Sequence, residues 1–303
     1  MNATLRLSLT ALLLLAMACS SSTPAPADRD SEKVLEPTEA DELQRLNEAA
    51  EEAFAGRLER QNVEQAIEAW KKVAALDSVK NDPEALAETY ENLAKAHYFL
   101  ARYHEALTDE PDKERILSAS KQGVEYAGLA VEIRAPDFHR SIKRGAPFEA
   151  ELEEAPPEAA HALLAYARNL DLWSKTEGVS ATVAGEPIVD SIMEFVAEHQ
   201  PEAHFGAAHR YFGTRWIERA FHRSPEKSAE AFETALELEP HFLITRVLRA
   251  RHLATATGDR DLFESDLQAV IAADEDLLPA ARAENAFARQ LAAALLADVE
   301  QYF

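Results

Sequence analysis

The spacing of helix-breaking residues constrains this chain more than any other feature. From Asp41 onward, Ala and Leu recur at three- and four-residue steps, which is the periodicity of amphipathic helices. Pro, Gly and Asp/Asn clusters interrupt this pattern at intervals of roughly 15 to 25 residues. Asp82-Pro83 and Ser224-Pro225 each place a capping side chain before a proline, as at the start of a helix. The sequence therefore predicts an all-α fold of about a dozen helices, stacked as hairpins.

Several of these segments carry part of a tetratricopeptide-like pattern. The second helix of such a repeat places a small residue, a large ring four positions later and a small residue three positions after that. Ser228, Phe232 and Ala235 have this spacing, and Ala66, Trp70 and Val73 nearly repeat it; Tyr90, Leu93, Ala94 and His97 fit the first helix. We predict a degenerate tetratricopeptide-like helical-hairpin solenoid over residues 41–303. An irregular all-α domain with chance matches is the alternative.

The N-terminus has the composition of a targeting segment. One charge, Arg6, precedes the apolar run "LSLTALLLLAMA", which ends at Ala18 and is too short to span a bilayer as a helix. Cys19, the only cysteine in the chain, follows directly. Residues 1–18 are predicted to be a lipoprotein signal peptide and Cys19 the lipidation site, because a lone thiol in an exported protein is a liability unless it is used. An ordinary secretory signal is the alternative.

Residues 19–40 are predicted to form a flexible, lipid-anchored tether, because this stretch is rich in Ser, Pro and Asp and poor in apolar residues. The whole chain carries a net charge of −23, which becomes −24 without residues 1–18, since Arg6 is their only charge. Such an acidic surface repels nucleic acid and anionic lipids, so we expect no nucleic-acid partner and membrane attachment through the lipid alone.

The stretch "GAAHRYFGTRW", residues 206–216, combines two glycines with an arginine and three rings in an otherwise helical region. In a continuous helix, Phe205, Phe212 and Trp216 would form one aromatic stripe, while Gly206, Arg210 and Gly213 would form a neighbouring stripe. Each glycine weakens a helix by about 1 kcal/mol relative to Ala, which indicates a close approach by another backbone. Arg210 is expected either to pair with a carboxylate or to stand at a cavity wall with Tyr211 or Phe212 beside it.

Six segments, read together, resemble the T component associated with TRAP transporters, a family of periplasmic lipoproteins. They are "ENLAKAHYFLA" (91–101), "GVEYAGLAVEI" (123–133), "YARNLDLWSKTEG" (166–178), "HFGAAHRYFGTRW" (204–216), "SAEAFETALELEPHFLITRVLRARHLA" (228–254) and "DRDLFESDLQAVIAADEDLLPAARAENAFARQLAAALL" (259–296). "RYFG" and "AEN" are the most specific of these.

The resemblance implies a helical subunit with a cavity or channel, self-association as a trimer, and a partner, the periplasmic substrate-binding protein (P component) of a TRAP system. It also implies a role in holding or passing small organic-acid or apolar ligands. Ser20 after Cys19 is not the aspartate that commonly retains lipoproteins at the inner membrane, which favours a lipid anchor at the outer membrane's periplasmic face. The alternative function is a tetratricopeptide-like scaffold lipoprotein for envelope assembly, with no small ligand.

Polar and aromatic residues on apolar helices supply the candidate cavity lining. Asn92 and Asn285 are expected to make either a helix–helix hydrogen bond or a polar contact in the cavity. Rings would suit an apolar or amphipathic ligand. The complete set of candidates is Asn92, Tyr98, Trp173, Arg210, Tyr211, Phe212, Trp216 and Asn285.

We predict no enzyme activity, catalytic residue, metal site or cofactor. The ten histidines include no HExxH motif, and His204 and His209 would lie about 140° apart on a helix, too far to share one ion. No phosphate-binding glycine loop and no nucleophile elbow occur.

Overall fold

The computed structural model describes residues 38–108, 110–219 and 221–303, which belong to one compact unit. The predicted signal peptide, Cys19 and nearly all of the predicted tether lie outside the described residues. The first helix, α1, spans Glu39–Ala55 and is capped by Thr38, whose hydroxyl accepts a hydrogen bond from the backbone of Asp41 at 3.2 Å. Helical structure thus begins two residues before the predicted domain boundary.

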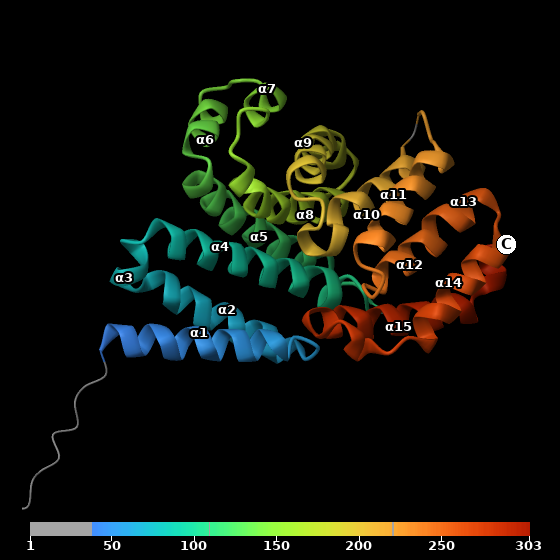
Figure 1. The fold of residues 1–303 in the computed structure, drawn as a ribbon, viewed down its shortest axis with the longest axis horizontal. Helices are drawn as coiled ribbons and strands as arrows, with labels where there is room; N and C mark the ends of the chain where they lie inside the picture. Colours follow the sequence, from blue (N-terminus) through green and yellow to red (C-terminus); the bar gives the residue numbers. More distant parts are fainter. Residues whose placement is uncertain (1–37, 109, 220) are drawn as a thin grey trace, which may run out of the picture. The chain divides into compact units, whose positions relative to one another are not determined.

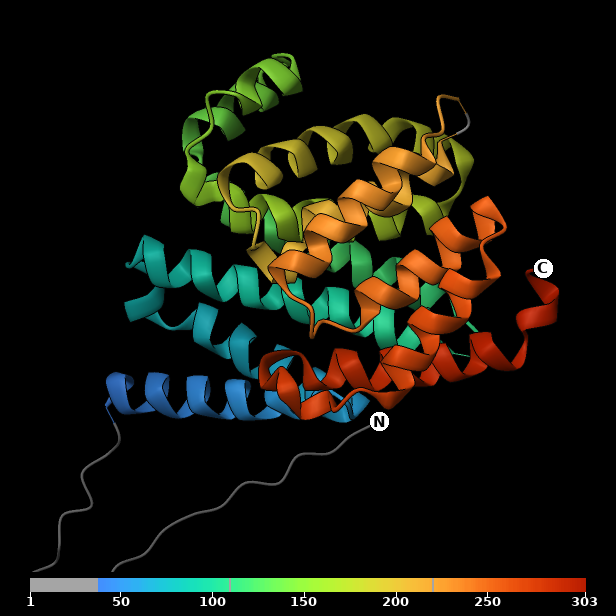
Figure 2. The ribbon, with the colours of Figure 1, turned by 45° about the vertical axis from the view of Figure 1, so that its right-hand side comes forward.

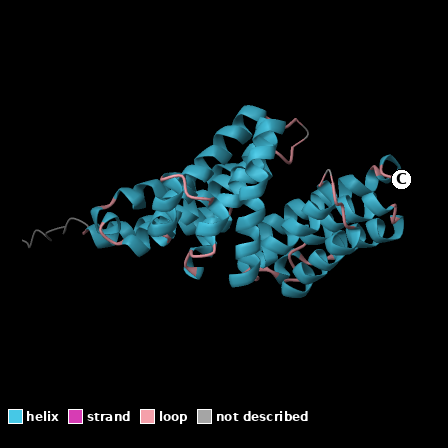
Figure 3. Cartoon of the chain, turned by 90° about the horizontal axis from the view of Figure 1, so that it is seen from above, coloured by secondary structure: helices cyan, strands magenta, loops and turns pink. Residues whose placement is uncertain are grey.

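The described residues form an all-α fold, as predicted, with no strand among them (Figures 1 and 3). They contain twelve helices of seven or more residues when the joined segments α12, η3 and α13 are counted as one. The α-helices after α1 are α2 (Arg60–Ala75), α3 (Asp77–Lys80), α4 (Pro83–Phe99), α5 (Lys113–Arg134), α6 (Pro136–Lys143), α7 (Phe148–Leu152), α8 (Ala160–Glu177), α9 (Val179–His199), α10 (Ala203–Glu218), α11 (Pro225–Leu238), α12 (Ile244–Leu248), α13 (Thr255–Thr257), α14 (Arg260–Ala272) and α15 (Arg282–Ala297).

Consecutive helices pack as hairpins, namely α1 with α2, α4 with α5, α8 with α9, α10 with α11, and α14 with α15. Two predicted helix starts are confirmed by their caps. The side chain of Asp82 accepts hydrogen bonds from the backbone of Glu84 and Ala85 at the start of α4, and the side chain of Ser224 accepts one from the backbone of Lys227 at the start of α11. The tetratricopeptide-like positions are core positions, because Ala66, Trp70 and Val73 on α2 and Ser228, Phe232 and Ala235 on α11 are all buried.

The row of hairpins is curled, so that its last helix, α15, contacts the first hairpin, α1 and α2 (Figure 1). Figures 1 and 2 both show α15 lying beside α1 and α2. Arg57, just after α1, and Glu284 on α15 form an ion pair of 2.6 Å, with only 7% and 4% of their side chains exposed. Phe287 on α15 packs on Phe99 and Tyr103. This contact, between residues 227 positions apart, brings the two ends of the array together beside a partly open inner space.

Helix α10 is not continuous, and this overturns the predicted aromatic stripe. His204, Phe205 and Gly206 have left-handed backbone angles, with φ of 45°, 61° and 76°. The break sends Phe205 to Phe242, with ring centres 4.9 Å apart, while Phe212 packs in a different core and Trp216 lies between Arg219 and Lys227. The stripe prediction was wrong because it assumed a regular right-handed helix through these residues.

A close approach by another backbone was predicted at both glycines, and it is confirmed at Gly206, whereas the near neighbour of Gly213 is a side-chain ring. A Cβ on Gly213 would lie 2.8 Å from the ring of Phe232, and one on Gly206 would lie 3.4 Å from the backbone of Ala235, both on α11. Helix α11 therefore approaches α10 at the two glycines, and Ser228 donates a hydrogen bond to the carbonyl of Gly213 at 2.5 Å.

Two helices widen locally into π-helical turns, η1 (Leu100–Glu105) after α4 and η3 (Arg249–Ala254) after α12. Each such turn displaces the side chains from the positions that a regular α-helix would give them. Both turns lie beside the same internal space, which is described next.

Candidate functional site

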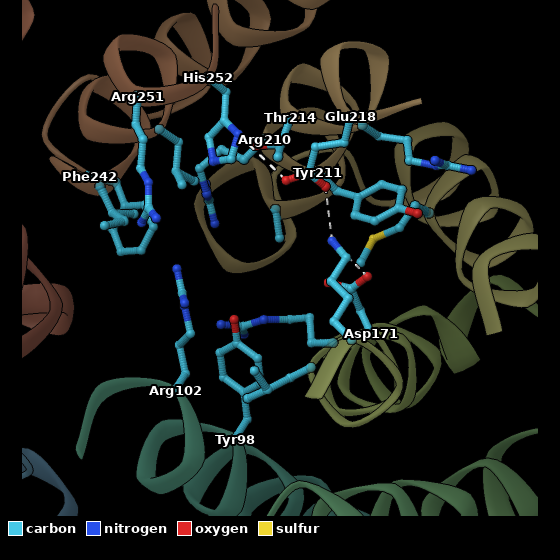
Figure 4. A pocket seen from close by; sticks show the side chains of 18 of the residues that line it. Tyr98, Arg102, Asp171, Arg210, Tyr211, Thr214, Glu218, Phe242, Arg251 and His252 are labelled. Atoms are coloured by element: carbon cyan, nitrogen blue, oxygen red, sulfur yellow. Dashed lines mark hydrogen bonds and ion pairs between the residues drawn. The ribbon is translucent and has the colours of Figure 1, made fainter. Parts of the chain in front are cut away.

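A cavity of about 330 Å³ lies inside the curl, between α8, α10 and the two π-helical turns. Figure 4 shows it from close by, with Tyr98 and Arg102 on one side and Arg210, Arg251 and His252 on the other. Its full lining is Tyr98, Arg102, Tyr103, Arg168, Asp171, Leu172, Lys175, Met193, Ala207, Arg210, Tyr211, Thr214, Arg215, Glu218, Phe242, Ile244, Leu248, Arg251 and His252. We call this space the first cavity.

Helical periodicity explains why these residues meet. The lining residues of α8 stand at positions 168, 171, 172 and 175, and those of α10 at 207, 210, 211, 214, 215 and 218. These steps of three and four place each set on one face of its helix. The turns η1 and η3 add Arg102 and Tyr103 from one side and Arg251 and His252 from the other.

The lining is cationic although the chain is acidic. Six Arg and Lys side chains face two carboxylates, a formal balance of +4 in a chain of net charge −23. Among the described residues, Arg102, Arg168, Arg210 and Arg251 have no carboxylate within ion-pair distance. In Figure 4, Arg102 and Arg251 extend from opposite sides into the same space. Four uncompensated guanidinium groups make this space attractive to an anion.

The opposite part of the wall is electrically balanced. Lys175 contacts Asp171 at 3.1 Å and Glu218 at 3.2 Å, and Glu218 also lies 3.5 Å from His252. Burial alone would lower the pKa of Lys175, but the two carboxylates outweigh it and the pKa is raised. Burial lowers the pKa of His252, which is therefore neutral at pH 7. Arg215 is held away from any ligand by Asp190 at 3.0 Å and Glu186 at 3.1 Å.

Arg210 has no carboxylate partner, so the ion-pair interpretation of this residue was wrong. Its guanidinium donates hydrogen bonds to the carbonyls of His204, at 2.7 Å, and Phe205, and lies 4.3 Å over the ring of Phe242. Burial, followed by repulsion from Arg168, lowers its pKa to about 9. Arg210 thus holds the left-handed turn in place and remains a buried cation at neutral pH that an anion would stabilise.

A second cavity, of about 360 Å³, adjoins the first. Its lining is Glu91, Asn92, Lys95, Tyr98, His161, Leu164, Ala165, Arg168, Asn169, Glu202, His204, Phe205, Ala280 and Glu284. Tyr98 and Arg168 belong to both linings, and the guanidinium carbon of Arg168 lies 3.9 Å from the centre of the Tyr98 ring. This stacked pair therefore stands at the boundary between the two spaces.

The structure brings four of the eight sequence-predicted residues to these cavities. Arg210 and Tyr211 line the first, Asn92 the second, and Tyr98 both. Tyr211 donates to Asp190 at 2.6 Å, and burial together with this carboxylate raises the pKa of its hydroxyl.

The other four predicted residues line neither cavity. Asn285 is fully buried. Its side chain accepts a hydrogen bond from the backbone of Leu243 at 3.0 Å and donates one to the carbonyl of His241 at 2.9 Å, so of the two expected roles it has the structural hydrogen bond and not the cavity contact. Trp173 is half-buried on α8, next to cavity-lining Leu172 but absent from both linings. Phe212 and Trp216 lie on another face of the regular part of α10, where Phe212 packs against a core cluster and Trp216 contacts Arg219 and Lys227.

Sequence reasoning missed the cationic lining, above all Arg102, Arg168 and Arg251. A signal for two of these residues was present, because Ala-Arg occurs at 101–102 and again at 250–251, each time followed within two residues by a histidine. The two copies form the two π-helical turns. Arg102 and Arg251 face the same cavity only because the array of hairpins curls, and that curl cannot be predicted from a short segment of sequence.

Residues 85–303, more than two thirds of the chain, match the TRAP transporter T-component family. The chain belongs to that family. The six segments that resembled it all fall within the matched range, so the recognition made from sequence is confirmed. No curated protein matches the chain at a significant level.

Membership makes this T-component a part of a TRAP transport system, in a family whose role is associated with transport. Within the described range, no helix is both long and apolar enough to cross a bilayer. No cluster of three or more potential metal ligands occurs among the described residues either.

Proposed function

We propose that this T-component binds a small organic anion in its first cavity and exchanges it with the substrate-binding protein of its TRAP system. The four guanidinium groups without carboxylate partners carry this proposal. Arg210 is buried, Arg102 and Arg168 are half-buried and Arg251 is exposed, so their charges repel one another across a partly open space, which favours a ligand that supplies negative charge. An acidic chain has many carboxylates available, yet none in its described part lies within ion-pair distance of these groups.

The lining also indicates the shape of the ligand. Guanidinium groups bind carboxylates through two parallel hydrogen bonds, which makes them well suited to an organic acid. Met193, Phe242, Ile244 and Leu248 supply an apolar surface beside them. A volume of about 330 Å³ is at the small end of ligand sites. We infer a small acid with a short apolar body, which is bound and released without covalent chemistry.

The N-terminal sequence supports a location for this activity. We propose that residues 1–18 direct export, that Cys19 carries the lipid, and that residues 19–40 hold the helical unit in the periplasm. We place the anchor at the outer membrane, because position 20 is Ser and not the aspartate that commonly retains lipoproteins at the inner membrane. Trimer formation and association with the P component are proposed from family membership.

The scaffold alternative has less support. A protein that only assembles other proteins would be expected to fill its interior and use an open concave groove. Here the ion pair between Arg57 and Glu284 joins α15 to the first hairpin. The curl of helices holds two adjoining cavities whose linings include cations without ion-pair partners.

A thermal-shift titration tests the ligand class. The chain from Ser20 to Phe303, which contains every described residue and no cysteine, is titrated with succinate and other small carboxylates, with their neutral methyl esters as matched controls. Acids should raise the melting temperature with the logarithm of their concentration once it exceeds the dissociation constant, and esters should not. Arg102→Gln and Arg251→Gln should weaken the effect. Equal shifts for acid and ester, or unchanged shifts in both variants, would refute the anion proposal.

Co-purification tests the partner. The full-length lipoprotein is purified from membranes of cells that also produce the P component of the same TRAP system, and the purified sample is tested for the P component. If no complex forms at micromolar concentration, the proposed exchange with the P component is refuted. The proposed ligand binding is then judged by the thermal-shift titration alone. Sedimentation of the Ser20–Phe303 chain decides the oligomeric state, and a clean monomer would remove the trimer.

A further inference from the structure

The two cavities share a single cationic side chain. Arg168 extends from α8, and α4 supplies Tyr98, on which the guanidinium stacks at 3.9 Å. Both residues belong to both linings. Among the described residues, Arg168 makes no hydrogen bond or ion pair with a carboxylate, so its five N–H groups have no carboxylate partner there.

The second cavity also contains positive charge without an ion-pair partner. Of its three carboxylates, Glu91 pairs with Arg134 at 2.9 Å and Glu284 with Arg57 at 2.6 Å, while the exposed Glu202 has no ion pair among the described residues. Lys95 faces the same space and has no ion pair in the described part of the chain. Burial, followed by repulsion from Arg57, lowers the pKa of Lys95.

One buried polar atom in that lining also lacks a partner, because Nδ1 of His204 has no hydrogen bond within the described residues. Burial, with Arg168 as the next cause, keeps the pKa of His204 well below its usual value, so the ring is neutral. An unpartnered buried polar atom is rare, and here it accompanies an unpaired lysine and the shared arginine.

We propose that Arg168 is a shared anion anchor for two ligand subsites, one in each cavity. A carboxylate in the first cavity, with Arg102, and a carboxylate in the second, with Lys95, would both bind the guanidinium of Arg168. An acid that moves between the subsites keeps one charged contact throughout, and Tyr98 positions that contact. The inference rests on the proposed function, because it concerns the same anionic ligand.

Thiol reactivity tests the proposal, since the Ser20–Phe303 chain has no cysteine of its own. Thr214→Cys reports on the first cavity and Asn92→Cys on the second. Each reporter is treated with anionic 2-sulfonatoethyl methanethiosulfonate and with neutral methyl methanethiosulfonate. The ratio of the two rates measures the attraction for an anion and cancels changes in access.

Arg168→Gln should lower this ratio by about three- to tenfold at both reporters, as expected for loss of one nearby charge in a partly wet site. Arg168→Lys, which keeps the charge, should preserve most of the ratio. Arg102→Gln should act only at Thr214→Cys and Lys95→Gln only at Asn92→Cys. Far-UV circular dichroism checks that each variant folds; if Arg168→Gln does not, Arg168→Met is measured in its place.

The outcomes separate the two levels of inference. If loss of the Arg168 charge lowers the ratio at one reporter only, or at neither while Arg102→Gln lowers it at Thr214→Cys, Arg168 is not shared and the inference is overturned. If Arg102→Gln and Arg251→Gln both leave the ratio at Thr214→Cys unchanged, the first cavity does not attract anions and the proposed function itself fails.

Discussion

Replacement of Gly123 by Ala should strongly destabilise this protein, although Ala is the better helix former. Gly123 lies on α5 where it faces Asn169 of α8. A Cβ built on Gly123 would lie 1.9 Å from Oδ1 of Asn169 and 2.3 Å from its Cγ. Asn169 is fully buried and donates to the carbonyls of Ala94, at 3.1 Å, and Ala165, at 2.9 Å, so it ties α8 to α4.

The magnitude follows from what Asn169 must give up. Turning the amide away loses the bond to Ala94, worth about 1 kcal/mol, and leaves a buried donor unsatisfied at a further cost of about 1–3 kcal/mol. Overpacking between the two helices adds about 1–3 kcal/mol. Against this, Ala gains roughly 1 kcal/mol in helix propensity. The net loss is about 2–6 kcal/mol, which lowers the melting temperature by roughly 5–20 °C in a domain of this size.

A second glycine in the same helix supplies the control. A Cβ on Gly128 would meet only the edge of the Tyr166 ring, at 4.0 Å, which is an ordinary contact. Gly128→Ala should therefore be neutral or stabilising by up to about 1 kcal/mol.

Thermal and urea unfolding, followed by far-UV circular dichroism, compare the variants. In the Asn169→Ala background, Gly123→Ala should cost much less than in the wild-type chain, because the clashing group is gone. The steric reasoning would be refuted if Gly123→Ala and Gly128→Ala changed stability alike, or if Asn169→Ala gave no relief.

Three further substitutions test other parts of the fold. Glu284→Ala leaves Arg57 as an unpaired buried charge and should cost about 3–5 kcal/mol in urea unfolding, whereas a loss below about 1 kcal/mol would mean that this pair does not hold the curl closed. His97 is buried without a hydrogen-bond partner among the described residues, and burial lowers its pKa to about 4. The unfolded chain then binds a proton that the folded chain does not, so stability should fall by roughly 2–3 kcal/mol as the pH drops from about 6.5 to 4, and His97→Leu should remove that part of the slope in unfolding measured across this range. Gly213→Ala should destabilise by about 1–3 kcal/mol, since its Cβ would lie 2.8 Å from the Phe232 ring, and Phe232→Leu should reduce the penalty in a double-mutant cycle.

Local pattern was enough to predict the helices and some of their contacts. The periodicity and the caps at Asp82 and Ser224 located helices, and the unusual glycines correctly indicated where α11 approaches α10. These features depend on residues within one or two turns of each other, so a short window of sequence contains the relevant physics.

The cavity depended on contacts that no short window contains. The pair Arg57–Glu284 closes the curl across 227 positions, and nothing near either residue marks it. The break in α10 was missed because two of its three left-handed residues, His204 and Phe205, are not glycines. Arg210 was singled out correctly, but its partners turned out to be carbonyls created by that same break.

The π-helical turns have a consequence for how this site could be gained or lost. A π-turn amounts to one additional residue accommodated within an α-helix. Deleting a single residue from η1 or η3 would restore a regular helix and turn every later side chain of that helix by about 100°. Arg102 or Arg251 would then leave the interior while the fold kept its helices. A one-codon deletion could thus remove an anion-binding side chain from the cavity without removing any helix of the fold.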